Sequence, residues 1–241
     1  MKIRSVDLLA LFAVLTLLAT PGAAQPPVEA VAEPAVAPVA DAEAPPELVR
    51  ITMETALGTI TFDLDKTNAP ITTANFLRYA KEGRFNGTTF YRVMRLDWGT
   101  PPNGLVQGGT QGQPGRNLEP IAHEPTSETG IVHKAGTISM ARFAPGTAAG
   151  DFTIMLSPQP GLDAQPDAHD PAARPGFAAF GHVVSGMDVI RAIYDVPLSL
   201  TKGEGYMRGQ MIEDPVKIVN VRQAPMPRAD TDSIEPAKSK Q

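Results

Sequence analysis

The histidines are the first residues whose chemistry we consider, because imidazole binds metals and transfers protons near neutral pH. The sequence has no cysteine, and its four histidines are His123, His133, His169 and His182. None of them has a second histidine or a cysteine at metal-ligand spacing, which argues against a zinc site. The lack of cysteine also removes disulfides and thiol nucleophiles. We therefore expect no metal site.

Signatures of other enzyme classes are missing as well. The sequence contains neither the Gly-x-Ser-x-Gly turn of serine hydrolases nor a phosphate-binding loop. Gly203, Gly205 and Gly209 come close to a dinucleotide fingerprint, but the last spacing is one residue too long and no βαβ pattern surrounds them. Nothing in the spacing of the aspartates brings a catalytic pair together. We expect no cofactor.

Composition and charge exclude two classes of binding partner. The 21 Lys and Arg against 26 Asp and Glu give a formal net charge of −5, which argues against a surface that neutralises nucleic-acid phosphates. Aromatic residues total only 6%, too few for the aromatic stripe of a sugar-binding barrel. We expect no nucleic-acid partner.

The two ends of the chain differ from its middle. Residues 1–24 combine a basic start, an apolar run over 8–18 and small residues at 22–24, which predicts a secretory signal peptide cleaved after Ala24. The apolar run is shorter than the roughly 20 residues that span a bilayer, so we expect no transmembrane segment in a mature periplasmic or secreted chain. Residues 25–47, rich in Pro, Ala and acid, predict a disordered linker, and 224–241 a disordered tail. A folded domain of 48–223 remains.

The middle of the chain carries many strand patterns and few helical ones. Polar and apolar residues alternate over 49–54 and 59–65 around a turn ending at Gly58, which predicts a hairpin. Asn68 as a cap, Pro70 and the apolar spacing that follows predict a helix ending near Gly83. Short apolar runs at 89–94, 105–107, 136–141, 152–156 and 178–184 precede a second helical pattern at 187–193 and a closing strand at 216–221. This order favours an antiparallel barrel or sandwich with appended helices.

Five blocks in these elements resemble one family. They are FYRV at 90–93, LVQGG at 105–109, GTISMA at 136–141, DFTI at 151–154 and FGHVVSGMDV at 180–189, and PITTANF at 70–76 looks like the same family's first helix. In this order and at these gaps they resemble the cyclophilin-type peptidyl-prolyl cis-trans isomerases. The resemblance implies a mainly β fold, a closed eight-stranded antiparallel β-barrel with an α-helix over each open end.

The reaction that the resemblance implies is rotation about an X-Pro bond, which meets a barrier of roughly 18–20 kcal/mol because the nitrogen lone pair is delocalised into the carbonyl. A donor aimed at the prolyl nitrogen weakens that delocalisation, so no proton has to be transferred. By position, Arg92 matches the family's essential arginine, whose rigid charged fork suits this role. Gln107 matches the glutamine that steadies the substrate carbonyl and the arginine.

The resemblance also implies a substrate groove. Its expected binding residues are Leu105, Ala141, Arg142, Asp151, Phe152, Thr153, Leu162 and Phe177. Thr153 and Gly104 stand where the family has phenylalanines, so two aromatic walls of the proline pocket are missing by alignment. Phe143, Phe152, Phe177 and the only tryptophan, Trp98, are candidates to refill the space. Phe177 replaces a rim histidine, and Gly161 aligns near the tryptophan linked to cyclosporin binding, which predicts low cyclosporin sensitivity.

Two further departures concern charge and length. Arg142 and Asp151 replace an Asn and a Gln of the family, and an ion pair between them is expected if both lie at one rim. The insertions 158–176 and 198–211 are either an extra substrate rim or tolerated surface loops. Two functions stay open: a monomeric isomerase acting on proline-containing unfolded or exported polypeptides, or a peptide-binding chaperone module with weak or no isomerase activity because the pocket is altered.

Overall fold

The computed structural model describes residues 44–226 of the 241-residue chain. The expected signal peptide 1–24, most of the expected linker 25–47 and most of the expected tail 224–241 lie outside these residues. Within 44–226, no helix is long and apolar enough to cross a membrane. The first strand begins at Leu48 and the last one ends at Gln223.

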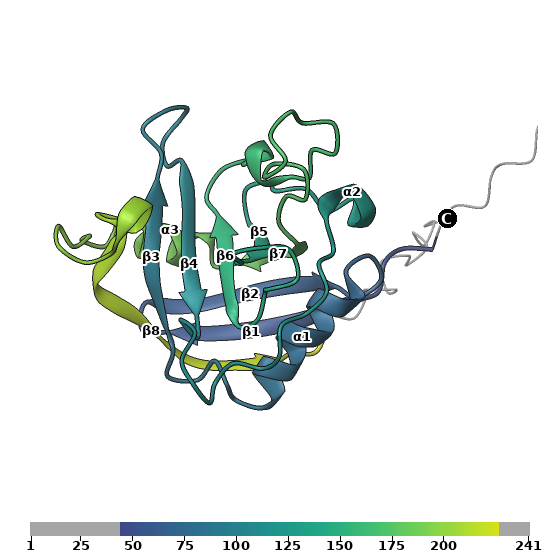
Figure 1. The fold of residues 1–241 in the computed structure, drawn as a ribbon. Coiled ribbons are helices and arrows are strands. Elements are labelled where there is room, and N and C mark those ends of the chain that lie inside the picture. Colours follow the sequence, from purple (N-terminus) through teal and green to yellow (C-terminus); the bar gives the residue numbers. More distant parts are fainter. Residues whose placement is uncertain (1–43, 227–241) are drawn as a thin grey trace, which may run out of the picture. The chain divides into compact units, whose positions relative to one another are not determined.

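The described residues form a closed barrel of eight antiparallel strands, which confirms the expected fold (Figure 1). The strands are β1 Leu48–Thr55, β2 Gly58–Asp65, β3 Thr89–Arg95, β4 Gly104–Gly109, β5 Thr137–Met140, β6 Asp151–Met155, β7 Ala179–Ser185 and β8 Met211–Gln223. Their order around the barrel is β1-β2-β7-β5-β6-β4-β3-β8. The last strand begins earlier than the sequence predicted, because Glu213, Asp214 and Pro215 interrupt its apolar pattern.

Two helices longer than a single turn pack on the barrel. Helix α1, Pro70–Lys81, contacts β2, β7 and β8, and α3, Met187–Asp195, contacts β2 and β4. The one-turn helix α2, Thr126–Thr129, and the 3-10 turns Pro160–Leu162 and Gly205–Met207 were not predicted, because such short elements carry no helical periodicity.

The cap of α1 differs from the prediction. Asn68 does not cap the helix: its side-chain amide donates to Asp65 Oδ2 at 2.7 Å, and the N-cap residue is Ala69. The carboxylate of buried Glu124 takes this role from a distant segment and accepts from the backbone N–H groups of Ile71 at 3.0 Å and Thr72 at 2.7 Å. A negative charge at the positive end of a helix is stabilising, and it ties α1 to the loop before α2.

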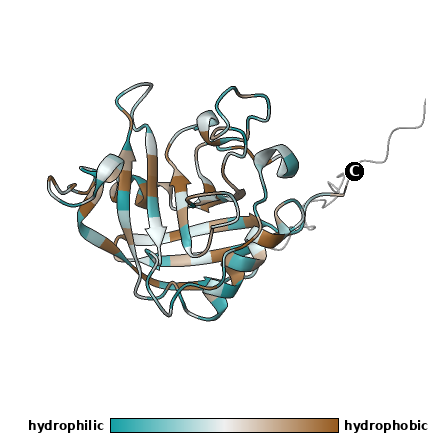
Figure 2. Ribbon diagram, in the orientation of Figure 1, coloured by the Kyte–Doolittle hydropathy of each residue, from teal (hydrophilic) through white to brown (hydrophobic). Residues whose placement is uncertain are grey.

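The barrel interior is filled by aliphatic side chains around a cluster of aromatic rings. Phe76 of α1 lies with its ring centroid 5.6 Å from that of Phe152 on β6, and Phe152 packs edge-on against Phe90 of β3 at 5.7 Å. Hydrophobic and hydrophilic residues alternate along the strands, so one face of each strand points into this core (Figure 2). The core fixes the strands whose other face carries the site.

A bulge in β3 changes this alternation at one place. Phe90 pairs with Gly108 of β4 and Arg92 with Gln107, so Tyr91 is an extra residue between two consecutive pairs. Phe90 and Val93 are fully buried in the core, and both residues between them face outward and line a cavity. A regular strand would have pointed Arg92 inward, because side chains alternate with a period of two. The bulge is what places this arginine on the outer face.

Candidate active site

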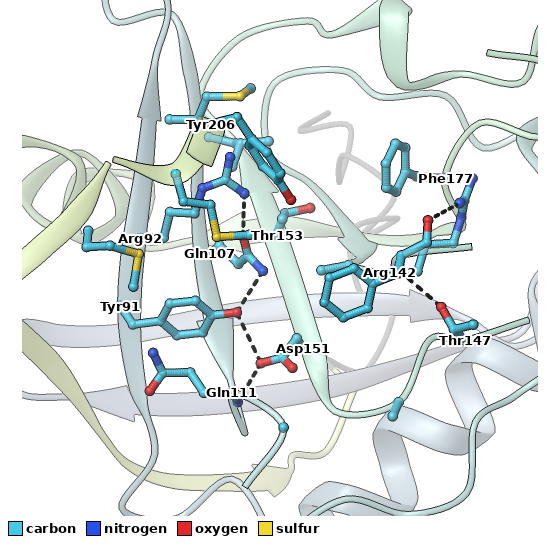
Figure 3. A pocket seen from close by; sticks show the side chains of 18 of the residues that line it. Tyr91, Arg92, Gln107, Gln111, Arg142, Thr147, Asp151, Thr153, Phe177 and Tyr206 are labelled. Atoms are coloured by element: carbon cyan, nitrogen blue, oxygen red, sulfur yellow. Dashed lines mark hydrogen bonds between the residues drawn. The ribbon is translucent and has the colours of Figure 1, made fainter. Parts of the chain in front are cut away.

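A cavity of about 570 Å³ lies on the outer face of β3, β4 and β6 (Figure 3). The strand register sets its floor: Arg92 pairs with Gln107, and Gln107 pairs with Thr153. These three side chains therefore form a row across three adjacent strands, and Asp151 lies two residues along β6 on the same face. The volume falls in the range of sites that bind small molecules or a few residues of peptide.

Hydrogen bonds connect the polar residues of this floor into a chain (Figure 3). Gln107 Oε1 accepts from Arg92 Nη1 at 2.8 Å, and Gln107 Nε2 donates to the Tyr91 hydroxyl at 2.7 Å. The Tyr91 hydroxyl donates to Asp151 Oδ1 at 3.3 Å, and the same oxygen accepts from the backbone N–H of Gln111 at 2.8 Å. The Gln107 amide is thus held in one orientation, with its oxygen toward the arginine.

The guanidinium of Arg92 is held without a counter-charge. Gln210 Oε1 accepts from its Nε at 2.9 Å and from its Nη2 at 2.6 Å, and the ring of Tyr206 lies 5.6 Å from its central carbon. No ion pair within residues 44–226 includes Arg92. Burial lowers the pKa of Arg92 from its ordinary value, yet an arginine remains charged at any working pH. The site therefore presents a positively charged guanidinium that no carboxylate neutralises.

Apolar side chains make up much of the cavity wall. They are Met94, Leu105, Leu162, Phe177, Tyr206, Met207 and Met211. Unbranched methionines fill irregular space well, so this wall suits a compact apolar ring next to the charged fork. The arrangement can bind an extended peptide with an apolar residue at the centre and can donate hydrogen bonds to its backbone.

Comparison with known proteins agrees with this geometry. Residues 50–223 match the family model described as cyclophilin type peptidyl-prolyl cis-trans isomerase/CLD. The chain belongs to the cyclophilin family. A peptidyl-prolyl cis-trans isomerase of Acinetobacter baylyi is 36% identical over 176 residues, which cover 71% of this chain and 84% of the relative. One of Streptomyces antibioticus is 30% identical over 157 residues, covering 64% and 87%.

The fold of this cyclophilin is also found in solved structures. A crystal structure of a Cryptosporidium parvum cyclophilin type isomerase superposes with a TM-score of 0.58 at 19% identity, covering 75% of this chain and 100% of that one. At this identity the likeness bears on the fold alone. The family model and the relatives together make the protein a cyclophilin-type peptidyl-prolyl cis-trans isomerase.

Nine of the ten site residues expected from the sequence line this same cavity. They are Arg92, Leu105, Gln107, Ala141, Arg142, Asp151, Thr153, Leu162 and Phe177. Phe152 does not line it, and its assignment to substrate binding is wrong. It lies between Asp151 and Thr153 on β6, so strand alternation turns its ring into the barrel interior, where it is fully buried.

The expected pairing of Arg142 with Asp151 is also wrong. The central carbon of Arg142 lies 4.6 Å from the ring centre of Phe177, and its Nη1 and Nη2 donate to the carbonyls of Phe143 and Gly176. Asp151 accepts instead from Tyr91 and Gln111. Two of these partners, Gly176 and Phe177, lie at the end of the 158–176 insertion, and sequence spacing alone could not place them there.

The altered proline pocket is refilled from other directions. Gly104 has a φ of +132°, and a Cβ there would overlap the carbonyl oxygen of Met94, so no aromatic residue fits at this position. Trp98 is 59% exposed and does not line the cavity, so its proposed role as a replacement wall is wrong. On the floor of the cavity, the hydroxyl of Thr153 donates to the Ser139 carbonyl at 3.3 Å, so its hydrogen-bonding capacity as a donor is used within the protein. The refilling comes from methionines, from Tyr206 and from two of the expected candidates, Phe143 and Phe177, which both line the cavity.

Sequence reasoning missed several residues of the site. Tyr206, Met207 and Met211 line the cavity, and Gln210 binds Arg92, so of the two alternatives for the 198–211 insertion the structure favours the rim of the site over a tolerated surface loop. Tyr91 lay inside a recognised block, next to Arg92, but its outward direction depends on the bulge. Within residues 44–226, no group of three or more His, Cys, Asp or Glu side chains could hold a metal ion.

Proposed function

We propose that this cyclophilin accelerates X-Pro isomerisation in exported proteins, with Arg92 donating a hydrogen bond to the prolyl nitrogen. The observation that carries the proposal is the uncompensated guanidinium of Arg92 at the edge of an apolar cavity. A donor that draws the lone pair back onto nitrogen lowers the double-bond character of the peptide bond. Each tenfold gain in rate asks for about 1.4 kcal/mol of stabilisation specific to the twisted state.

The residues around Arg92 have separate tasks in this mechanism. The prolyl ring lies against Leu105 and the methionines of the wall, which bury it from water. Gln107 holds Arg92 through its oxygen, and its amide nitrogen carries a second N–H that can donate to a substrate carbonyl. One side of the peptide is thus fixed while the other rotates. No group transfers a proton.

The location of the substrates is inferred from the ends of the chain. The pattern of a signal peptide over 1–24 and the acidic linker over 25–47 support export to the periplasm or beyond, where the domain would act as a monomer on unfolded chains. We expect the protein recovered from the exported fraction of a bacterial host to begin at Gln25. Protein that stays in the cytosolic fraction with residues 1–24 attached would overturn this part of the proposal.

The second candidate function is a peptide-binding chaperone module with little isomerase activity. The observation that favours it is Thr153, which puts a hydroxyl where the family has an aromatic wall. A module of this kind would bind proline peptides but leave their exchange rate unchanged. The refilled methionine wall supports the isomerase instead, because it restores apolar surface beside Arg92.

The test is an NMR exchange assay of X-Pro peptides with the 25–241 chain, comparing wild type with Arg92→Ala and Arg92→Lys. We expect kcat/KM to fall by roughly 100-fold in Arg92→Ala, or about 2.7 kcal/mol, and by less in Arg92→Lys, which keeps the charge without the fork. Arg95→Ala is the matched control, because Arg95 lies on the same strand but donates to the Tyr194 and Val196 carbonyls, outside the cavity. Equal rates in wild type and Arg92→Ala would refute the mechanism, and negligible rates in both would favour the chaperone.

A further inference from the structure

Gln210 binds the catalytic candidate Arg92 more extensively than Gln107 does. Its side-chain oxygen accepts from Nε at 2.9 Å and from Nη2 at 2.6 Å, whereas Gln107 accepts only from Nη1 at 2.8 Å. A guanidinium has five N–H groups, so these three bonds leave one free N–H on each Nη. Both free groups are available to a substrate, and the two glutamines fix the direction in which they point.

The backbone of Gln210 is itself anchored to the strand that carries Arg92. Its carbonyl accepts from the backbone N–H of Val93 at 2.8 Å, and its N–H donates to the Met207 carbonyl at 3.0 Å. The next residue, Met211, pairs with Arg92 in the β3–β8 ladder, and a bridge between Leu198 and Ile212 closes the base of the loop. The segment before β8 therefore lies beside β3 (Figure 1), and Gln210 has little freedom to leave the arginine.

The residue type at 210 matters as much as its position. An amide oxygen orients a guanidinium but carries no net charge, whereas a carboxylate at the same place would form a bidentate ion pair and neutralise it. The reaction needs the positive charge directed at the prolyl nitrogen. A glutamine satisfies both requirements: it fixes the fork and leaves its charge for the substrate.

We propose that Gln210 is a positioning residue of the isomerase, which aims the Arg92 fork at the prolyl nitrogen without compensating its charge. The 198–211 insertion is then part of the catalytic apparatus and not a tolerated loop. This inference rests on the proposed role of Arg92, and it assigns to Gln210 no contact with the substrate.

The test compares Gln210→Ala and Gln210→Glu in the full exported chain by the same exchange assay. We expect kcat to fall about fivefold to tenfold in Gln210→Ala, with KM within twofold of wild type, because the substrate-binding surface is unchanged. Gln210→Glu keeps the shape and the acceptor but adds a charge, so its kcat falls at neutral pH and recovers on acidification as the carboxyl is protonated. Wild type and Gln210→Ala have no such pH dependence. Gln223→Ala, at the far end of β8, is the control and leaves both parameters unchanged.

A second comparison separates this inference from the mechanism on which it rests. In an Arg92→Lys background, Gln210→Ala should have a clearly smaller effect, because lysine has no fork to aim. Equal effects in the two backgrounds would mean that Gln210 acts independently of Arg92 and would overturn the inference. Wild-type kcat in folded Gln210→Ala together with an inactive Arg92→Ala would overturn it while leaving the mechanism intact. Full activity in Arg92→Ala would overturn the mechanism first.

Discussion

The inner and outer faces of β3, β4 and β6 share one backbone, but only the outer face carries a connected row of polar side chains among its apolar ones. Inward, Phe90, Val106 and Phe152 are fully buried among other apolar side chains. Outward, Arg92 and Gln107 belong to a hydrogen-bonded row of polar groups beside a cavity. The same strands thus build the core with one face and the floor of the cavity with the other.

The two faces also differ in how their residues are held in place. The inner face depends on dense packing, in which Phe76, Phe85 and Phe152 each lie against three other rings at centroid distances of 4.8 to 5.7 Å. The outer face depends on directional bonds that run from Asp151 through Tyr91 and Gln107 to Arg92. Substitutions on the inner face should therefore lower the free energy of unfolding, and substitutions on the outer face should lower the isomerisation rate.

Phe152→Ala is the sharpest test of the inner face, with the largest expected effect. Removal of this ring from the aromatic cluster should lower the free energy of unfolding by about 3–5 kcal/mol. Because the ring lies behind the floor of the cavity and does not line it, kcat/KM per folded molecule should stay within a few fold of wild type. Urea denaturation and the exchange assay measure the two quantities. Unchanged stability with lost activity would mean that Phe152 serves the cavity and not the core.

Gln107→Leu tests the outer face. The change removes the acceptor of Arg92 Nη1 and the donor to the Tyr91 hydroxyl, so we expect about a tenfold fall in kcat/KM, or about 1.4 kcal/mol. The loss of folding free energy should be smaller than that of Phe152→Ala, since leucine fills the same space at the edge of an open cavity. An unfolding midpoint that falls as far as in Phe152→Ala would show that both faces serve stability alike.

Asp151→Asn has the smallest expected effect and concerns pH. Burial raises the pKa of Asp151, against the hydrogen bonds that favour its charged form. The Asp151 carboxyl therefore holds its proton to a higher pH in the folded protein than in the unfolded chain. The protonated carboxyl favours the folded state, and this contribution to stability is lost as the pH rises through the pKa of the folded state. Asparagine keeps an oxygen that accepts from Gln111 and Tyr91. We expect the variant to gain stability over wild type at pH 7 and not at about pH 3.

Denaturant midpoints at the two pH values measure this difference. Asp167→Asn is the control, because Asp167 is exposed on the 158–176 insertion. A variant less stable than wild type at pH 7 would mean that the charge of Asp151 stabilises the floor, and the polar row would then contribute to folding as the core does.

The sequence predicted the strands that carry the site correctly, but it was wrong about the contacts of several single residues. The blocks at 90–93, 105–109 and 151–154 became the strands of the floor, because local pattern and turn residues fix strands of this length. The role of Phe152 could have been excluded from the alternation of β6 itself, whereas the errors at Arg142 and Trp98 depend on other segments. Phe152 was assigned without knowledge of the face it occupies, Arg142 was paired without knowledge of where Phe177 lies, and Trp98 was placed by proximity in the chain alone.

Short-range patterns in the sequence predicted the order of strands and helices, and the resemblance of its blocks to one family pointed to Arg92 and Gln107. The tertiary structure, in contrast, sets the outward direction of Arg92, because a bulge at Tyr91 shifts the register of β3 against β4 and β8. It alone brought Gln210, 118 residues along the chain, onto the same guanidinium. Such contacts depend on how the barrel closes, and closure is a property of all eight strands together.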